Sequence, residues 1–237
     1  MIRISVADLI IELDNRYGYV KDLARDYITE SVGESHLTVS ASDTDIRLEA
    51  EASDIPHSPG YLESIVLYRE IAERLPRFDA FVFHGAVIAL DGAAYAVTAR
   101  SGVGKTTHLR LWMKAFGDRV HILNGDKPIL RIIDGRVYAC GTPWRGKENY
   151  GVPEMLPLEG IAFLERGEEN SARRITVGEG LIRFVSQIYV PRMPSSASMA
   201  LSVANRIISS VPLYELRANM DISAATVAYD AFTKKTN

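Results

Sequence analysis

A glycine-rich segment near the middle of the chain carries the residue types that bind polyphosphates. It follows the apolar stretch 94–98 and precedes a helical pattern that begins at Lys105. Glycines at 102 and 104 would let the backbone bend until several N–H groups point at one spot, on the positive end of that helix. The sequence therefore predicts a nucleotide-binding loop made of Ser101, Gly102, Val103, Gly104, Lys105, Thr106 and Thr107.

Two side chains of this loop have the chemistry that a nucleotide and its metal need. The Lys105 ammonium would place a point charge on the β- and γ-phosphates, and the Thr106 hydroxyl would bind Mg²⁺. The general loop pattern has glycine where this chain has Ala99. Alanine fits at that place if its φ is negative.

An acidic residue after the next apolar strand is the candidate for a second metal ligand. Residues 120–123 form that strand, and Asn124-Gly125-Asp126-Lys127 follow it. Carboxylates that hold Mg²⁺ beside a nucleotide collect at such strand ends, so we assign this role to Asp126. The alternative is that Asp126 and Lys127 only form a turn before Pro128.

Three further residues could act beside the loop. His84 lies in the expected strand before the loop strand, where its imidazole could reach the phosphates or could simply be a core residue. Arg145 and Lys147, in the turn-rich segment 141–148, are suited to clamp phosphoryl oxygens. A polar segment of this kind can equally be solvated surface.

The elements around the loop predict a mixed sheet. Asp91-Gly92 separates the expected strands 81–90 and 94–98, and Asp134-Gly135 separates 129–133 and 136–140. Asp-Gly between apolar strands is a strong hairpin signal, so antiparallel pairs flank the loop. Downstream we expect a strand at 160–165, helices at 180–190 and 195–210, a strand at 213–217 and a final helix from near Asp221.

The N-terminal part has a different pattern. Apolar and polar residues alternate at 2–6, 37–40 and 46–49, as in half-buried strands. A segment rich in proline and serine follows at 53–60, and then a helical pattern ends at Pro76. We expect a small β-rich subdomain at 1–58 and a nucleotide-binding domain at 59–237.

Composition limits the class of protein. The chain has 237 residues, a formal charge of −3 and one cysteine, Cys140, so no internal disulfide can form. This charge gives no global attraction to nucleic acid or anionic lipid, and no apolar leader or long apolar span is evident. We expect a cytoplasmic protein without nucleic-acid or membrane partners.

With these residues in place, segment 80–170 resembles the HPr kinase/phosphorylase group, which is related to ATP-dependent phosphoenolpyruvate carboxykinase. The resemblance rests on His84-Gly85, the loop 101–106, Asp126-Lys127-Pro128, Gly141 to Trp144 and Leu164 to Gly167. It implies an α/β fold with a P-loop core and a mixed, partly antiparallel sheet. It also implies an ATP- and Mg²⁺-dependent kinase that phosphorylates a hydroxyl, most often serine, of a small protein or peptide. His84, Lys105 and Asp126 would be its catalytic residues, and the chain could form a homo-oligomer.

One position departs from that group. The family has two adjacent aspartates at the strand end, the first acting as base, and Gly125 occupies what looks like the first position. Either Asp126 is the base, or another group replaces it, or the chain binds nucleotide with little turnover. The alternatives are therefore a catalytically degenerate nucleotide-binding regulator, or a carboxykinase-like enzyme that acts on a small carboxylic acid.

Overall fold

Two Asp-Gly hairpins build the strands around the glycine-rich loop. The first joins β5 (Ala86–Leu90) to β6 (Ala93–Thr98), and the second joins β8 (Ile129–Ile133) to β9 (Arg136–Cys140). The turn residues have positive φ in both, 50° and 80° at Asp91 and Gly92, and 49° and 78° at Asp134 and Gly135. The positive φ at both residues of each turn matches the tight hairpin turn that an Asp-Gly dipeptide predicts.

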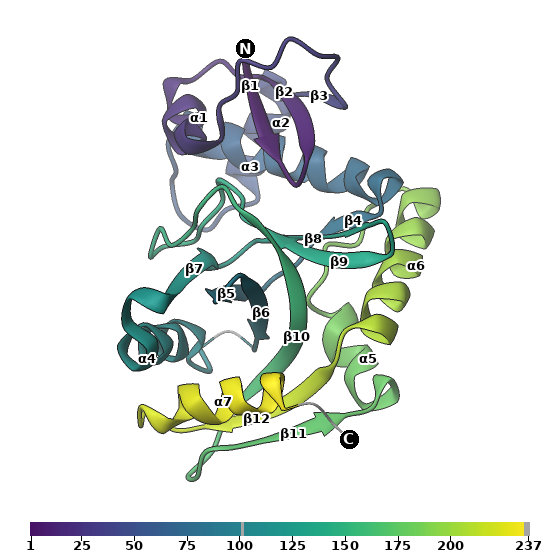
Figure 1. Ribbon diagram of the computed structural model, residues 1–237. Coiled ribbons are helices and arrows are strands. Elements are labelled where there is room, and N and C mark those ends of the chain that lie inside the picture. Colours follow the sequence, from purple (N-terminus) through teal and green to yellow (C-terminus); the bar gives the residue numbers. More distant parts are fainter. Residues whose placement is uncertain (101, 235–237) are drawn as a thin grey trace.

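The hairpins belong to one curled, mixed sheet of nine strands (Figure 1). The computed structural model, which describes residues 1–100 and 102–234, orders seven of them β4-β8-β9-β10-β6-β5-β7, with β12 beside β10 and β11 beside β12. β10 pairs antiparallel with β9 but parallel with β6 and β12. The expected mixed sheet is confirmed. The remaining strands are β4 (Ala80–Val82), β7 (Val120–Asn124), β10 (Met155–Arg166), β11 (Ser171–Ile175) and β12 (Leu213–Ala218).

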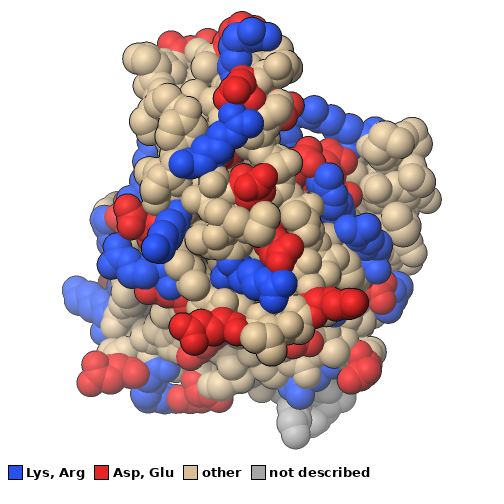
Figure 2. All heavy atoms as spheres, turned by 90° about the horizontal axis from the view of Figure 1, so that it is seen from above, with Lys and Arg blue, Asp and Glu red and all other residues tan. Residues whose placement is uncertain are grey.

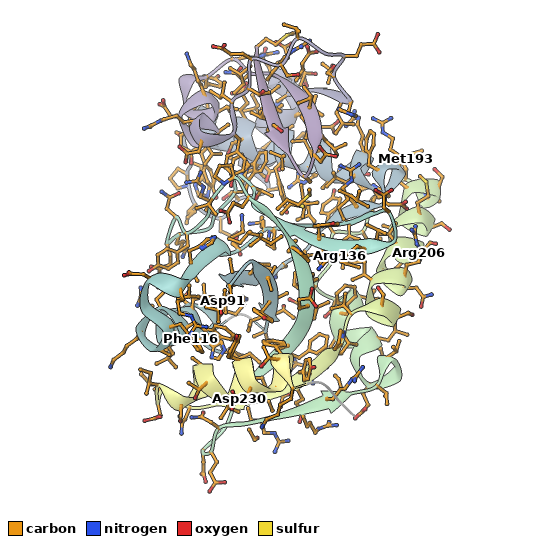
Figure 3. The ribbon with its side chains drawn as sticks, viewed as in Figure 1. Asp91, Phe116, Arg136, Met193, Arg206 and Asp230 are labelled. Atoms are coloured by element: carbon orange, nitrogen blue, oxygen red, sulfur yellow. The ribbon has the colours of Figure 1, made fainter. Side chains whose placement is uncertain are left out.

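Helices cover both faces of this sheet. α5 (Val177–Val185) and α6 (Pro194–Ser210) pack on one face, where Phe81, Phe163 and Ile207 share a buried cluster. α4 (Lys105–Phe116) and α7 (Ser223–Thr233) pack on the other face through Trp112 and Phe232. Figure 3 shows the end of α4 at Phe116 above α7, which carries Asp230. The start of α4, next to the glycine-rich loop, is thus held on a rigid sheet.

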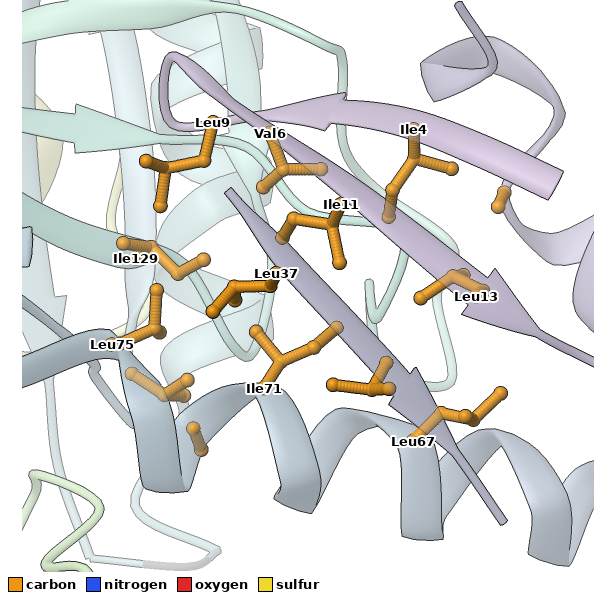
Figure 4. Packing of buried hydrophobic residues seen from close by; sticks show 14 of the residues in the cluster. Ile4, Val6, Leu9, Ile11, Leu13, Leu37, Leu67, Ile71, Leu75 and Ile129 are labelled. Carbon is orange, nitrogen blue, oxygen red and sulfur yellow. The ribbon is translucent and has the colours of Figure 1, made fainter. Parts of the chain in front are cut away.

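The N-terminal part has its own small sheet and core. β1 (Ile2–Val6) and β2 (Leu9–Asp14) pair antiparallel, and β3 (Leu37–Ser40) pairs parallel with β2. Their inward residues pack on α3 (Pro59–Arg74), as Ile11 and Ile71 do in Figure 4. The boundary near residue 58 stays a prediction, and α3, which follows it in the chain, packs on the N-terminal sheet. The other helices are α1 (Gly18–Leu23), α2 (Asp43–Glu51) and the short 3-10 helices Arg25–Tyr27, Leu75–Phe78 and Gly117–Arg119.

Several predicted elements were wrong in part. Residues 46–49 are in α2 rather than in a strand, because Ser42 and Asp45 form a reciprocal capping box that starts a helix there. The predicted strand 81–90 is broken between β4 and β5 at residues 83–85. The predicted helix 180–190 begins at Val177, behind a second capping box, and ends at Val185. β10 begins five residues before the predicted strand 160–165.

The surface mixes charges of both signs. Seen from the side of the N-terminal sheet, Lys and Arg side chains lie among Asp and Glu side chains (Figure 2). Within residues 1–100 and 102–234, no helix has the length and apolar character that a membrane crossing requires.

Candidate nucleotide and phosphoryl-transfer site

The glycine-rich loop joins the end of β6 to the start of α4. Gly102 and Gly104 have φ of 78° and 125°, which L side chains adopt at a cost in strain. A side chain at either position would meet nothing within 4 Å, so open space adjoins the backbone. No side chain caps the first turn of α4, which leaves helical N–H groups available for an anion. Ala99 is not among the described residues with positive φ, and Ser101 lies outside the described residues.

Lys105 begins α4 and turns its ammonium back toward the loop. Its Nζ donates to the Ala99 carbonyl oxygen at 3.2 Å. Burial lowers the pKa of Lys105, and the negative charge of Asp126 opposes that effect. The two side chains are therefore electrostatically coupled, although they come from different elements.

A cleft of about 730 Å³ opens beside the loop, and we name it the main cleft. It brings together residues that are up to about 130 positions apart in the sequence, from Tyr19 to Tyr150. The predicted site residues that line it are His84, Gly102, Gly104, Lys105, Thr106, Thr107, Asp126, Arg145 and Lys147. Val103 lines a neighbouring cavity instead.

Asp126 stands at the end of β7, in a turn that a buried side chain fixes. Asn124 Oδ1 accepts hydrogen bonds from the backbone N–H groups of Asp126 and Lys127, at 2.9 and 2.8 Å. Asn124 Nδ2 donates to the carbonyl oxygen and hydroxyl of Thr142. Both side chains are buried. The turn therefore has little freedom to move the carboxylate.

Two cationic or proton-bearing groups hold the Asp126 carboxylate. His84 Nε2 lies 3.5 Å from Oδ1, and Lys127 Nζ lies 2.8 Å from Oδ2. Burial raises the pKa of Asp126, but hydrogen bonds from His84 and Lys127 outweigh it and hold this pKa well below its usual value. The carboxylate is ionised at neutral pH and can attract a divalent cation.

His84 comes from the break between β4 and β5, which explains why it is not a core residue. Its backbone N–H donates to the Gln187 carbonyl oxygen, and its own carbonyl oxygen accepts from Thr98. The next residue, Gly85, donates its N–H to the Asp126 carbonyl oxygen at 3.0 Å. The backbone is thus fastened on both sides while half of the imidazole side chain stays exposed in the main cleft.

The segment 141–150 forms the wall opposite the loop and is tied to the N-terminal part. Trp144 Nε1 donates to the Ser64 carbonyl oxygen at 3.1 Å. Arg145 Nη2 pairs with Asp26 at 2.6 Å, and its guanidinium lies 5.4 Å from the centre of the Tyr27 ring. Arg145 is therefore already paired, whereas Lys147 is exposed at the edge of the cleft.

Sequence reasoning assigned no role in the site to three residues, Arg166, Tyr19 and Tyr61. Arg166, at the end of β10, donates to the carbonyl oxygens of Gly102 and Val103 at 2.7 and 3.2 Å. Its sequence signals were a charge at a strand end and its place in the segment Leu164 to Gly167, which carries part of the family resemblance. Tyr19 and Tyr61, from α1 and α3, also line the main cleft. Nothing in the local sequence signals their part in it.

Comparison with known proteins finds similarity at the level of solved structures, among them a distant neighbour. No family model matches the sequence, and no curated protein matches it. One of the similar structures is that of the HPr(Ser) kinase/phosphatase from Coxiella burnetii. The alignment covers 62% of this chain and 91% of the Coxiella burnetii chain, at a TM-score of 0.37 and 10% sequence identity. The chain therefore has a distant structural similarity to an HPr kinase/phosphatase.

Proposed function

We propose that this protein is an ATP- and Mg²⁺-dependent kinase that transfers the γ-phosphoryl group to a hydroxyl, most often serine, of a small protein or peptide. One observation carries the proposal. The uncapped start of α4, the Lys105 ammonium and the Asp126 carboxylate all face one cleft of about 730 Å³. Helical N–H groups with a lysine bind phosphates, and a nearby carboxylate is what a phosphate-bound metal requires.

The residues present fit a nucleotide and its metal. Glycine at 102 and 104 leaves room for phosphate oxygens against the backbone. Magnesium beside a nucleotide usually takes one or two protein ligands together with phosphate oxygens and water. Thr106 and Asp126 would supply those protein ligands, and the metal would neutralise charge on the transferring group.

The part of the main cleft that Tyr19 and Tyr61 line is the proposed place of the acceptor. Both residues belong to the N-terminal part, so that part would help to recognise the acceptor. Asp126 and His84 line the same cleft. In the proposed reaction the acceptor oxygen forms a bond to the γ-phosphorus, the bond to the β–γ bridging oxygen breaks, and Asp126 Oδ1 takes the hydroxyl proton.

Arg145 and Lys147 have different places in this proposal. Lys147, exposed at the edge of the cleft, would clamp phosphoryl oxygens directly. Arg145 would do so only after leaving Asp26, so in the unliganded protein it fixes the wall of the cleft.

Substitution of Lys105 tests the proposal. We expect Lys105→Ala to weaken binding of Mg–ATP by about 10- to 100-fold, because a charged hydrogen bond contributes about 1.5–3 kcal/mol. The matched control is Lys114→Ala, an exposed lysine in the last turn of the same helix. Calorimetry measures both affinities. Equal affinity of Lys105→Ala and the native protein would contradict the proposal.

A nucleotide-binding regulator without transfer is the second candidate, and Gly125 favours it. A kinase of the resembled group has a carboxylate at that position, and this chain has none. The two candidates differ in turnover. A kinase converts ATP to ADP when serine-bearing peptides are supplied, whereas a regulator binds Mg–ATP and leaves it intact.

A further inference from the structure

A second cavity of about 470 Å³ adjoins the other side of the glycine-rich loop. We name it the β10–β12 cavity, because residues 164–167 at the end of β10 and 218–220 after β12 form its outer wall. It shares Gly102, Gly104 and Thr107 with the main cleft. The loop therefore separates two hollows, and a ligand that lies along the loop can enter both.

The two hollows differ in chemistry. The main cleft contains Asp126, His84 and Lys127, the groups that attract a metal and phosphoryl oxygens. The β10–β12 cavity combines apolar side chains, Val103, Leu164, Ala218 and Met220, with polar ones, Thr107, His108, Glu165, Arg166 and Asn219. Apolar contacts together with hydrogen-bonding groups are typical of sites that hold flat organic ligands.

We propose that the β10–β12 cavity receives the nucleoside part of the triphosphate, an inference that rests on the proposed function. A triphosphate is a linear chain with the nucleoside at one end and the transferable group at the other. With the terminal phosphoryl group beside Asp126 in the main cleft, a triphosphate that lies along the loop can place its nucleoside in the hollow beyond the shared residues Gly102, Gly104 and Thr107. The β10–β12 cavity is the hollow found there.

Arg166 is placed to act on both the loop and the base. Its Nη2 and Nε donate to the Gly102 and Val103 carbonyl oxygens, which fixes the plane of the guanidinium. A fixed guanidinium plane can stack on an aromatic base. Arg166 is thus a positioning residue for the loop and one wall of the base pocket.

A buried donor in the same wall lacks a partner. The indole N–H of Trp112 can only donate, and it donates to His108 Nε2 at 2.9 Å, so the imidazole proton is on Nδ1. Nδ1 is buried and has no hydrogen-bond partner among the described residues. His108 lines the β10–β12 cavity. Buried polar groups normally have a hydrogen-bond partner. An acceptor atom of the base or ribose would supply one for the His108 Nδ1–H donor.

Comparison of Mg–ATP with magnesium tripolyphosphate tests the inference, because the second ligand has the phosphates without the nucleoside. We expect calorimetry to show the native protein binding ATP at least about tenfold more tightly. Met220→Ser should weaken ATP binding by about three- to tenfold through loss of apolar contact, and should leave tripolyphosphate binding unchanged. Met220 is 80% exposed, so its replacement does not threaten folding.

Two further variants complete the test. Met199→Ser, at an exposed methionine of α6 that lines neither hollow, should change neither affinity. Arg166→Ala should weaken both ligands, because it loosens the loop that both use. Equal affinities of the native protein for the two ligands, or an equal loss of both in Met220→Ser, would overturn the inference and leave the proposed function intact. Binding of neither ligand would overturn both.

Discussion

His108 should make the stability of this protein fall as the pH is lowered below neutrality. The imidazole is 2% exposed, one turn into α4, and its Nε2 accepts the indole N–H of Trp112. Burial alone lowers the pKa of His108 from 6.5 to about 4. The folded protein thus holds this ring neutral at pH values where an unfolded chain would protonate it.

The direction and the size of the effect follow from this difference. Above pH 6.5 the ring is neutral in both states, and its contribution to stability is complete. Below that value the unfolded state binds a proton that the folded state excludes, so stability is lost as the pH falls toward 4. Each unit of pKa difference corresponds to about 1.4 kcal/mol, which gives a loss of about 2 kcal/mol between pH 7 and pH 5.

Urea denaturation followed by tryptophan fluorescence measures this loss, since Trp112 is fully buried. Other groups also titrate, so the quantity to compare is the difference between the native protein and His108→Gln, whose amide oxygen can still accept from Trp112. We expect this difference to change by about 2 kcal/mol from pH 7 to pH 5, with the native protein losing more. His57→Gln, a partly exposed ring, is the control variant. A difference that stays constant over this range would refute the reasoning.

Two glycine positions give further predictions. Gly146→Ala should cost more stability than Gly135→Ala, because both have positive φ but only the first would place its Cβ 2.8 Å from the Cβ of Asp126. The overpacking adds about 1–3 kcal/mol in denaturation experiments and should also weaken Mg–ATP binding. Gly125→Asp should lower stability by a similar amount of about 1–3 kcal/mol, because its Cβ would lie 3.1 Å from the Arg145 carbonyl oxygen. It should not raise ATP turnover, and a several-fold gain would contradict this account.

Much of the larger sheet could be predicted from local chemistry. Asp91-Gly92 and Asp134-Gly135 specify turns with positive φ, and the apolar runs beside them supply the strands. Such signals lie within a few residues, so no tertiary contact is needed to recognise them. The parallel pairing of β10 with β6 and β12 had no such signal. The paired residues of β10 and β6 are more than 60 positions apart along the chain, so no local pattern records their contact.

The errors have local physical causes. Alternation at 46–49 suggested a strand, but the capping box at Ser42 and Asp45 starts a helix and the exposed polar residues allow it. The uninterrupted apolar pattern at 81–90 hid a break at His84 and Gly85. At the break, a side chain on Gly85 would collide with the Phe83 ring, 2.5 Å from its Cβ, so the site requires glycine. Close approach between segments is invisible in a hydrophobic pattern.

The candidate site was predictable where one short segment carries it and not where segments meet. The loop residues follow a motif with fixed spacing, and Asp126 follows a strand end. The placement of His84 beside Asp126 depends on the break before β5 and on the Gly85–Asp126 backbone hydrogen bond. Tyr19 and Tyr61 line the cleft because α1 packs on α3 and Trp144 bonds to α3 at Ser64, which no local pattern encodes.

The packing around Gly125 bears on which group could serve as the base. Its N–H donates to the Tyr150 carbonyl oxygen, and the Arg145 carbonyl oxygen fills the space where a side chain would start. A carboxylate at 125 would therefore require a small shift of the backbone at Arg145, which the ion pair of Arg145 with Asp26 opposes. Among the described residues that line the main cleft, the carboxylates are Asp126 and Glu148, and Glu148 pairs with Arg110 at 2.9 Å. If the chain is a kinase, we expect Asp126 to act both on the metal and on the acceptor proton, because the other described carboxylate of the cleft is already paired with Arg110.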